Sequence, residues 1–191
     1  FNTVFLKVTD YYPQIGTDTQ KKVEYFLNLN RTLKGKTLIY AGSFSNITSL
    51  SNLILETSPK IDSVLLNDFS DLLGKNYDYN WNLTLLAKRG VGVHNGSLHR
   101  SLSQIQIKLF EENEGLNRII STSSIIEGVN TSAENVIVWM TSGRGLQFSN
   151  FAYKNLIGRA GRMFKHFIGN IYVLAKRDRK STRLNSSHIA R

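Results

Sequence analysis

The eight residues Gly35-Lys36-Thr37-Leu38-Ile39-Tyr40-Ala41-Gly42 contain the clearest strand signal of the chain. Residues 37–41 form a short, largely apolar run with a glycine on either side, and they do not alternate between apolar and polar side chains. A continuous run of this kind is typical of a strand buried on both faces of a parallel sheet. Ser45 or Asn46 can cap a helix that follows and continues to about Glu56. The stretch therefore predicts a strand–helix unit of an α/β fold.

Strand signals and helix signals also alternate along the rest of the chain. Apolar spacing in the residues before the strand predicts a helix over 21–33, after a short apolar start at 4–6. Later runs predict strands at 91–94, 118–122, 135–139 and 169–174, and helices at about 81–88, 98–111 and 150–163. Residues 60–80 carry no clear pattern. Strands that alternate with helices predict an α/β domain with a parallel sheet.

Composition limits the classes of function. The chain has 191 residues, 41% hydrophobic residues, no cysteine and four histidines, so we expect a folded domain without disulfides and without a metal site. No apolar run reaches the roughly 18 residues that a membrane span needs, and we expect a cytoplasmic protein with no membrane partner. Lys and Arg number 24 against 14 acidic residues, which gives a net charge of +10. This charge favours phosphate-bearing partners, although a basic balance can also serve solubility alone.

Gly35-Lys36-Thr37 looks like the end of a Walker A loop, but two features argue against that interpretation. A Walker A loop needs a glycine five positions earlier, where this chain has Asn30. The loop also follows a strand and opens a helix, whereas this tripeptide precedes a strand. We therefore expect no P-loop here.

The two ends of the chain have unusual sequences. The chain begins at Phe1 without Met, so we expect a fragment with further sequence upstream. Residues 178–191 resemble a translated sequencing adapter, with a natural basic tail as the alternative. Without them the net charge falls from +10 to +7, because they hold four basic residues and one acid. The remaining excess lies in 144–177, which has no acid and seven basic residues: Arg144, Lys154, Arg159, Arg162, Lys165, Lys176 and Arg177.

The most specific motif is Asn155-Leu-Ile-Gly158-Arg159-Ala-Gly161-Arg162. Arginines three residues apart share one face of a helix, and the two glycines allow that face to approach another backbone or a ligand closely. Paired guanidinium groups beside glycines suit a phosphate group. A plain basic helix is the alternative, and the surrounding motifs decide against it.

Together these motifs resemble the C-terminal RecA-like domain of superfamily 2 helicases, nearest the superkiller and DNA-repair branch related to DEAD/DEAH-box proteins. Residues 155–162 match the pattern Q-x-x-G-R-x-G-R with Asn155 in place of Gln, and Ile119–Asn130 matches a strand that ends in Thr followed by G-V-N. Val91–Arg100 resembles G-V-x-H-H-A-G-L-x-R, with Asn95 for the second His, and Leu38–Ser43 matches the motif IV strand. The motifs follow the family order across about 37–174.

The resemblance implies a RecA-like, P-loop NTPase-type parallel sheet flanked by helices and lacking its own P-loop. It also implies a domain division, with 1–36 as a linker or the end of a preceding domain and 37–177 as the RecA-like domain. The adapter-like sequence of 178–191 marks that segment as a non-native tail.

The resemblance further implies roles for named residues. Arg159 and Arg162 would be arginine fingers that reach the γ-phosphate of ATP. ATP and Mg²⁺ would be bound mainly by an N-terminal RecA-like domain absent from this chain, so we expect the chain alone to be inactive. Residues near the nucleotide or the domain interface would be Gly128, Asn130, Asn155 and Gly158. Residues that contact nucleic-acid phosphates would be Ser43, His94, Asn95, Thr122 and Ser123. For His94, a structural histidine is an equal alternative.

The expected function is that of the C-terminal motor domain of an ATP-dependent helicase or translocase acting on DNA or RNA. A helicase, a repair enzyme and a phage-defence translocase all share these motifs, so the pathway stays open. The alternative class is a non-catalytic nucleic-acid-binding or scaffold module that kept the fold.

Overall fold

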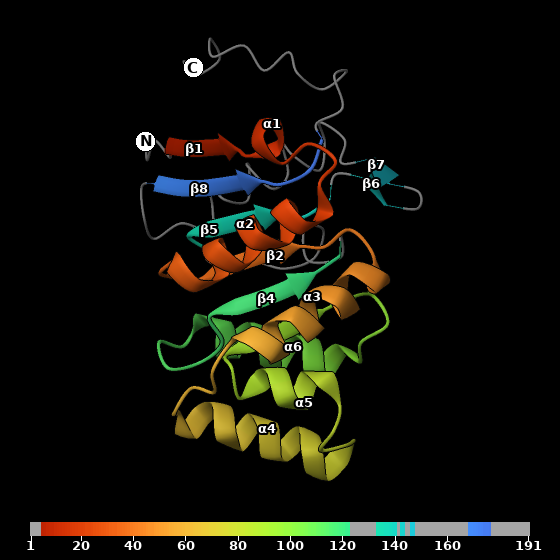
Figure 1. Cartoon of the computed structure of the whole chain (residues 1–191). Coiled ribbons are helices and arrows are strands. Elements are labelled where there is room, and N and C mark those ends of the chain that lie inside the picture. Colours follow the sequence, from red (N-terminus) through yellow and green to blue (C-terminus); the bar gives the residue numbers. More distant parts are fainter. Residues whose placement is uncertain (1–4, 123–132, 141, 144–145, 148–167, 177–191) are drawn as a thin grey trace.

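The central strand of the molecule is β2 (Thr37–Tyr40), whose four residues are all buried. It pairs in parallel with β4 (Arg118–Ser121) on one side and with β5 (Asn135–Val138) on the other. The computed structural model describes residues 5–122, 133–140, 142–143, 146–147 and 168–176. Helices of these residues flank the sheet on both faces (Figure 1). The expected parallel α/β fold is therefore confirmed.

Three further strands complete this sheet within the described residues. β3 (Val91–His94) pairs with β4, β8 (Ile168–Val173) pairs with β5, and β1 (Phe5–Asp10) pairs with β8, all in parallel. The resulting order is β1-β8-β5-β2-β4-β3. Two short strands, β6 (Ser142–Gly143) and β7 (Leu146–Gln147), form a separate antiparallel pair. The strands predicted from residue 37 onward agree with those observed to within one residue.

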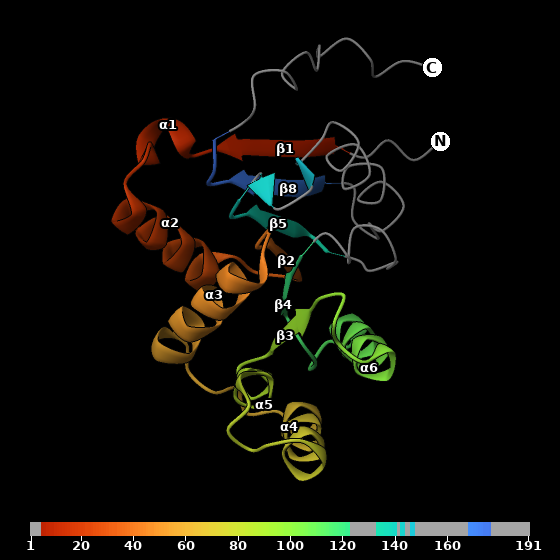
Figure 2. The same ribbon diagram turned by 90° about the vertical axis from the view of Figure 1, so that its right-hand side faces the viewer.

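Six helices lie in the described part of the chain: α1 (Tyr12–Ile15), α2 (Thr19–Thr32), α3 (Phe44–Thr57), α4 (Val64–Asn76), α5 (Asn82–Ala87) and α6 (Arg100–Glu111). Figure 2 shows α2 and α3 on one face of the sheet and α6 on the other. α5 packs against β3 and α3, and α4 packs against α5 beyond that edge of the sheet. The predicted helix at 150–163 falls outside the described residues.

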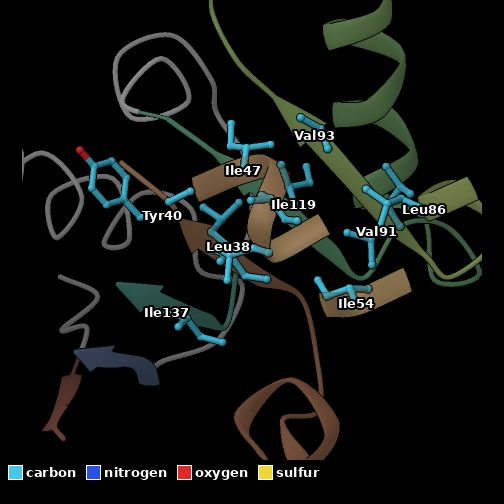
Figure 3. Close-up of a cluster of buried hydrophobic side chains, with 14 of the residues drawn as sticks. Leu38, Tyr40, Ile47, Ile54, Leu86, Val91, Val93, Ile119 and Ile137 are labelled. Carbon is cyan, nitrogen blue, oxygen red and sulfur yellow. The ribbon is translucent and has the colours of Figure 1, made fainter. Parts of the chain in front are cut away.

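One part of the hydrophobic core lies between the sheet and the helices α3 and α5. Side chains of β2, β3, β4 and β5 meet Ile47 and Ile54 of α3 and Leu86 of α5 (Figure 3). Ile39, Ile54, Leu86 and Ile119 are fully buried. β2, β3, β4 and β5 are buried on both faces, and this explains why continuous, largely apolar runs identified them in the sequence.

Two helices, α3 and α4, begin at serine caps that were not predicted from the sequence. The Ser43 hydroxyl accepts a hydrogen bond from the Asn46 N–H at 3.2 Å, so Ser43 caps α3, and the expectation of Ser45 or Asn46 was wrong. Ser63 caps α4 in the same way through the Leu66 N–H. α4 lies in the region 60–80, for which no element was predicted, and it buries Leu66, Phe69 and Leu73 on one face.

Residues 5–36, which lie in the segment 1–36 predicted as a linker or the end of a preceding domain, contact the later elements. β1 is hydrogen-bonded along its full length to β8. On α2, Phe26 is fully buried and meets the Trp139 ring edge-on at 5.6 Å. Lys22 Nζ lies 4.3 Å from the centroid of the same ring. No break in the sheet or the core coincides with residue 36.

The amino-terminal edge of the sheet is held by two cationic side chains. The buried Arg118 guanidinium donates hydrogen bonds to the carbonyl oxygens of Gly35 at 3.0 Å, Asn30 at 3.2 Å and Leu33 at 2.6 Å. Lys36 Nζ donates to the carbonyl oxygens of Glu112 and Leu116. Lys36 therefore serves a structural purpose at the start of β2, in agreement with the rejection of a Walker A loop.

A side chain of α6 closes the free edge of β3. Gln106 Oε1 accepts a hydrogen bond from the Val93 N–H at 2.7 Å, and Gln106 Nε2 donates to the Val93 carbonyl at 2.9 Å. The amide thus occupies the position that a neighbouring strand would take. Gly92 is required beside it, because a Cβ there would lie 2.7 Å from Gln106 Oε1.

We predict that Gln106→Ala lowers the free energy of unfolding by about 1–3 kcal/mol, because it leaves buried backbone groups of Val93 without hydrogen bonds. Urea unfolding followed by circular dichroism measures the change. Gln104→Ala, at an exposed position of the same helix, is the matched control and should shift stability by less than about 0.5 kcal/mol. Equal losses in the two variants would contradict the edge-closing role.

Candidate nucleic-acid interface

Three adjacent strands, β2, β4 and β3, end at the same edge of the sheet, which we call the carboxyl edge. In the observed register, Tyr40 of β2 is paired with Ser121 of β4, and Ser121 is paired with His94 of β3. The alignment continues one step further, because the Ala41 N–H donates to the Ser121 carbonyl at 2.8 Å and the Thr122 N–H donates to the His94 carbonyl at 3.3 Å. Carboxyl ends of parallel strands are the usual place for a ligand in an open α/β sheet.

Four of the five residues predicted to contact nucleic acid lie within the described residues, and all four follow or end these strands. They are Ser43, His94, Asn95 and Thr122. Ser123 falls outside the described residues. The sequence placed these residues in three separate motifs, and the sheet brings them to one edge. What they bind there stays a prediction.

Ser43 lies at the junction of β2 and α3. Gly42 before it has φ +80°, a conformation suited to glycine, and this turn brings the chain from the strand into the helix. The Ser43 hydroxyl lies 3.0 Å from the Ser45 hydroxyl and also caps α3. Asn46 fixes the turn, since its Nδ2 donates to the Ala41 carbonyl at 2.8 Å. The first turn of α3, with its backbone N–H groups, is thus presented at the carboxyl edge.

His94 is the last residue of β3, and its side chain is 8% exposed. Burial lowers the pKa of His94 below its ordinary value of 6.5, because a charged imidazolium is poorly solvated there. Of the two alternatives that the sequence left open for His94, this burial favours the structural histidine.

Asn95, by contrast, is half-buried at the surface of the same edge. Its Oδ1 accepts a hydrogen bond from the Ser97 N–H at 3.0 Å, which shapes the turn between β3 and α6. The side chain therefore has a fixed position, and it lines a groove.

This groove was not predicted from the sequence. It has a volume of about 370 Å³, and its walls come from the first two turns of α3, from residues 80–83 at the start of α5, and from the segment after β3. Phe44, Trp81, Asn95 and Leu98 are among the lining residues. Only the packing of α5 against α3 and β3 brings these segments together, so no local sequence signal could have identified the groove.

The nucleotide-site predictions all fall outside the described residues. They concern the arginine fingers Arg159 and Arg162, and the residues Gly128, Asn130, Asn155 and Gly158. Over the described ranges, no group of three or more His, Cys, Asp and Glu side chains is placed to hold a metal ion. In the same residues, no helix has both the length and the apolar character needed to cross a membrane.

Comparison with solved structures identifies the fold. The C-terminal domain of the DEAD-box protein Dbp5 superposes with a TM-score of 0.52 at 15% identity, covering 95% of this chain and 79% of that domain. The C-terminal part of the Fun30 ATPase domain gives a TM-score of 0.54 at 17% identity, covering 80% of this chain and 40% of that one. The fold is that of a RecA-like helicase C-terminal domain. The predicted fold class is thereby confirmed.

Sequence comparison adds one relative. The chain is 30% identical over 176 residues to Anti-bacteriophage protein B of Escherichia coli strain K12. The match covers 91% of this chain but 23% of that protein, so the chain spans about a quarter of the relative's length. No family model matches the chain.

We predict that stability decreases as the pH falls below about 6.5, in part because of His94. The unfolded chain binds a proton near the ordinary imidazole pKa, whereas the folded protein binds it only at a lower pH. Protonation therefore favours the unfolded state in that window. The free energy of unfolding, measured by urea titration between pH 7.5 and 5.5, should fall less steeply in His94→Gln. An equally steep slope in that variant would show that His94 is not responsible.

Proposed function

We propose that this chain is the C-terminal motor domain of an ATP-dependent nucleic-acid helicase or translocase. The alignment of the carboxyl ends of β2, β4 and β3 carries this proposal, because it brings Ser43, Asn95 and Thr122 to one edge. We assign the chain to the superkiller and DNA-repair branch of superfamily 2, as its motifs suggest.

The carboxyl edge has the chemistry to bind a sugar–phosphate backbone. α3 begins directly after β2 and α6 begins shortly after β3, so both helices present their N-termini there. Unpaired N–H groups and the helix dipole favour a phosphate at such a terminus. The hydroxyl groups of Ser43 and Thr122 and the amide of Asn95 add uncharged donors. Contacts of this type hold a strand without reading its sequence, as a motor that moves along any sequence requires.

The nucleotide part of the proposal concerns residues outside the described ranges. Arg159 and Arg162 would stabilise the charge that develops on the γ-phosphate of ATP, with Gly128, Asn130, Asn155 and Gly158 beside the nucleotide. Lys36 does not fit the role of a P-loop lysine, because its Nζ donates hydrogen bonds to carbonyl oxygens. ATP and Mg²⁺ would be held mainly by an N-terminal RecA-like domain, which is a required partner.

The similarity to Anti-bacteriophage protein B favours a role in bacteriophage defence over the other pathways that the motifs allow. A non-catalytic nucleic-acid-binding or scaffold module is the second candidate function. The two differ in whether a sequence upstream carries G-x-x-x-x-G-K-T followed by D-E-x-[DH], which only the motor needs.

We predict that Ser45→Glu weakens binding of single-stranded DNA or RNA by about fivefold or more at low salt. The added carboxylate lies in the first turn of α3, where it is compatible with the helix dipole but repels a phosphate. Fluorescence anisotropy with labelled 12-residue strands of each type measures the affinity.

Asn67→Glu is the matched control, because it adds the same charge at an exposed position of α4. It should bind within about twofold of the wild type. Equal affinities for Ser45→Glu and Asn67→Glu would show that the phosphates of the strand do not pass the first turn of α3.

We predict that the chain alone does not hydrolyse ATP, and that Arg159→Ala lowers ATP hydrolysis about 10³-fold once the chain is joined to its N-terminal RecA-like domain. Release of inorganic phosphate in the presence of a single strand measures the rate. Arg144→Ala is the control for loss of a basic side chain from residues 144–177. Full activity of Arg159→Ala would contradict the arginine-finger assignment.

A further inference from the structure

The groove beside Asn95 differs in chemistry from the edge that surrounds it. Two aromatic side chains line it: Phe44, which is 54% exposed, and Trp81, which is half-buried. Ile47, Leu83 and Val93 contribute apolar surface, and none of the lining residues is charged. A phosphate group would lose its hydration there without gaining a counter-charge, so the groove is unsuited to the backbone of a nucleic acid.

Five polar residues line the groove: the amides Asn80, Asn82 and Asn95 and the hydroxyl residues Thr48 and Ser51. An amide can both donate and accept hydrogen bonds, and this combination matches the edge of a nucleobase. The faces of a base are apolar and stack well on aromatic rings. A volume of about 370 Å³ lies in the range of sites that enclose a small planar group. Aromatic walls with amides among them therefore favour a base over a phosphate or a cation.

Two of the lining side chains are held in place by neighbours. The Trp81 ring lies 5.5 Å from the Tyr77 ring, tilted by 47°, and this contact restricts its orientation. Asn82 Nδ2 donates to Asn52 Oδ1 at 3.3 Å. A preorganised wall loses little side-chain freedom when it binds, which strengthens a stacking contact.

The groove adjoins two of the residues that we propose contact phosphates, Ser43 and Asn95. Phe44 directly follows Ser43, and Asn95 belongs both to the groove lining and to the predicted nucleic-acid contacts. A strand whose phosphates pass these two residues would bring one of its bases over the opening of the groove.

We propose that the groove receives one unstacked nucleobase of the single strand bound at the carboxyl edge, stacked against Phe44 and Trp81. This inference rests on the proposed function, since it requires a single strand at that edge. The base anchors the strand between phosphate contacts, and it does so for any sequence because every base has an aromatic face.

The test compares two ligands of equal length and charge: a 12-residue oligothymidylate and a strand of 12 abasic residues. Fluorescence anisotropy gives the affinity of the 191-residue chain for each, and oligouridylate provides the RNA arm. The wild-type chain should bind the intact strands about tenfold or more tightly than the abasic strand. In Phe44→Ala that preference should fall below about threefold, with affinity for the abasic strand unchanged.

Phe44→Ala is compatible with the fold, because Phe44 is exposed at the first position of α3 and alanine favours helix. Val64→Ala is the matched control. It also shortens an exposed apolar side chain at the first position of a helix, α4, but Val64 does not line the groove. This variant should keep the full preference for intact strands.

Tryptophan fluorescence gives an independent measurement. Intact strands should quench part of the emission of the wild type, and this part should be absent in Trp81→Phe, which keeps a ring in the wall. One contrary result is that intact strands bind tightly but Phe44→Ala prefers them over the abasic strand as strongly as the wild type does, and another is that the wild type shows no such preference. Either result would overturn the base site and leave the proposed function standing. Absence of single-strand binding at any ionic strength would overturn both.

Discussion

The parallel pairing of β2 with both β4 and β5 is the constraint on which the other elements depend. It places three fully buried strands in one register, and their apolar side chains form the surface on which α3 and α5 pack. The amino ends of these strands are tied to the end of α2 by Arg118, whose guanidinium donates to the carbonyl oxygens of Asn30, Leu33 and Gly35. With the amino ends fixed and the register shared, the carboxyl ends must also align. The candidate site is a consequence of this alignment.

The residues of the candidate interface and the groove depend on different elements for their positions. β3 is an edge strand, and its position depends on Gln106 of α6 as well as on β4. Because Asn95 follows β3 directly, α6 indirectly positions a residue of the candidate interface. The groove also needs α5, which must pack against β3 and α3 before Trp81 and Phe44 can line the same groove. The proposed phosphate contacts thus depend on the sheet together with α3 and α6, whereas the proposed base contact depends on α5 as well.

The sequence was most informative where structure is local. A buried parallel strand is a continuous apolar run, so 37–41 and the four later strands could be recognised within one residue. α4 was missed although Leu65, Leu66, Phe69 and Leu73 follow helical spacing, with Asp68 and Asp71 on the exposed face, and its cap, Ser63, was not recognised. The place of β1 in the sheet could not be predicted either, because its partner β8 is over 150 residues away. Ser43 was assigned to ligand contact alone, although its hydroxyl also caps α3. The groove joins Phe44, Trp81 and Asn95, and only the tertiary packing of three elements brings such distant residues together.

The proposed function requires that a single strand binds across the carboxyl edge of β2, β4 and β3. Solution NMR of the ¹⁵N-labelled chain, titrated with a short single-stranded oligonucleotide, tests this directly. We expect the largest amide shifts at residues 41–46, 94–100 and 122. Shifts centred on Lys36 and Arg118, at the amino-terminal edge of the same sheet, would contradict it, as would a spectrum that the oligonucleotide leaves unchanged.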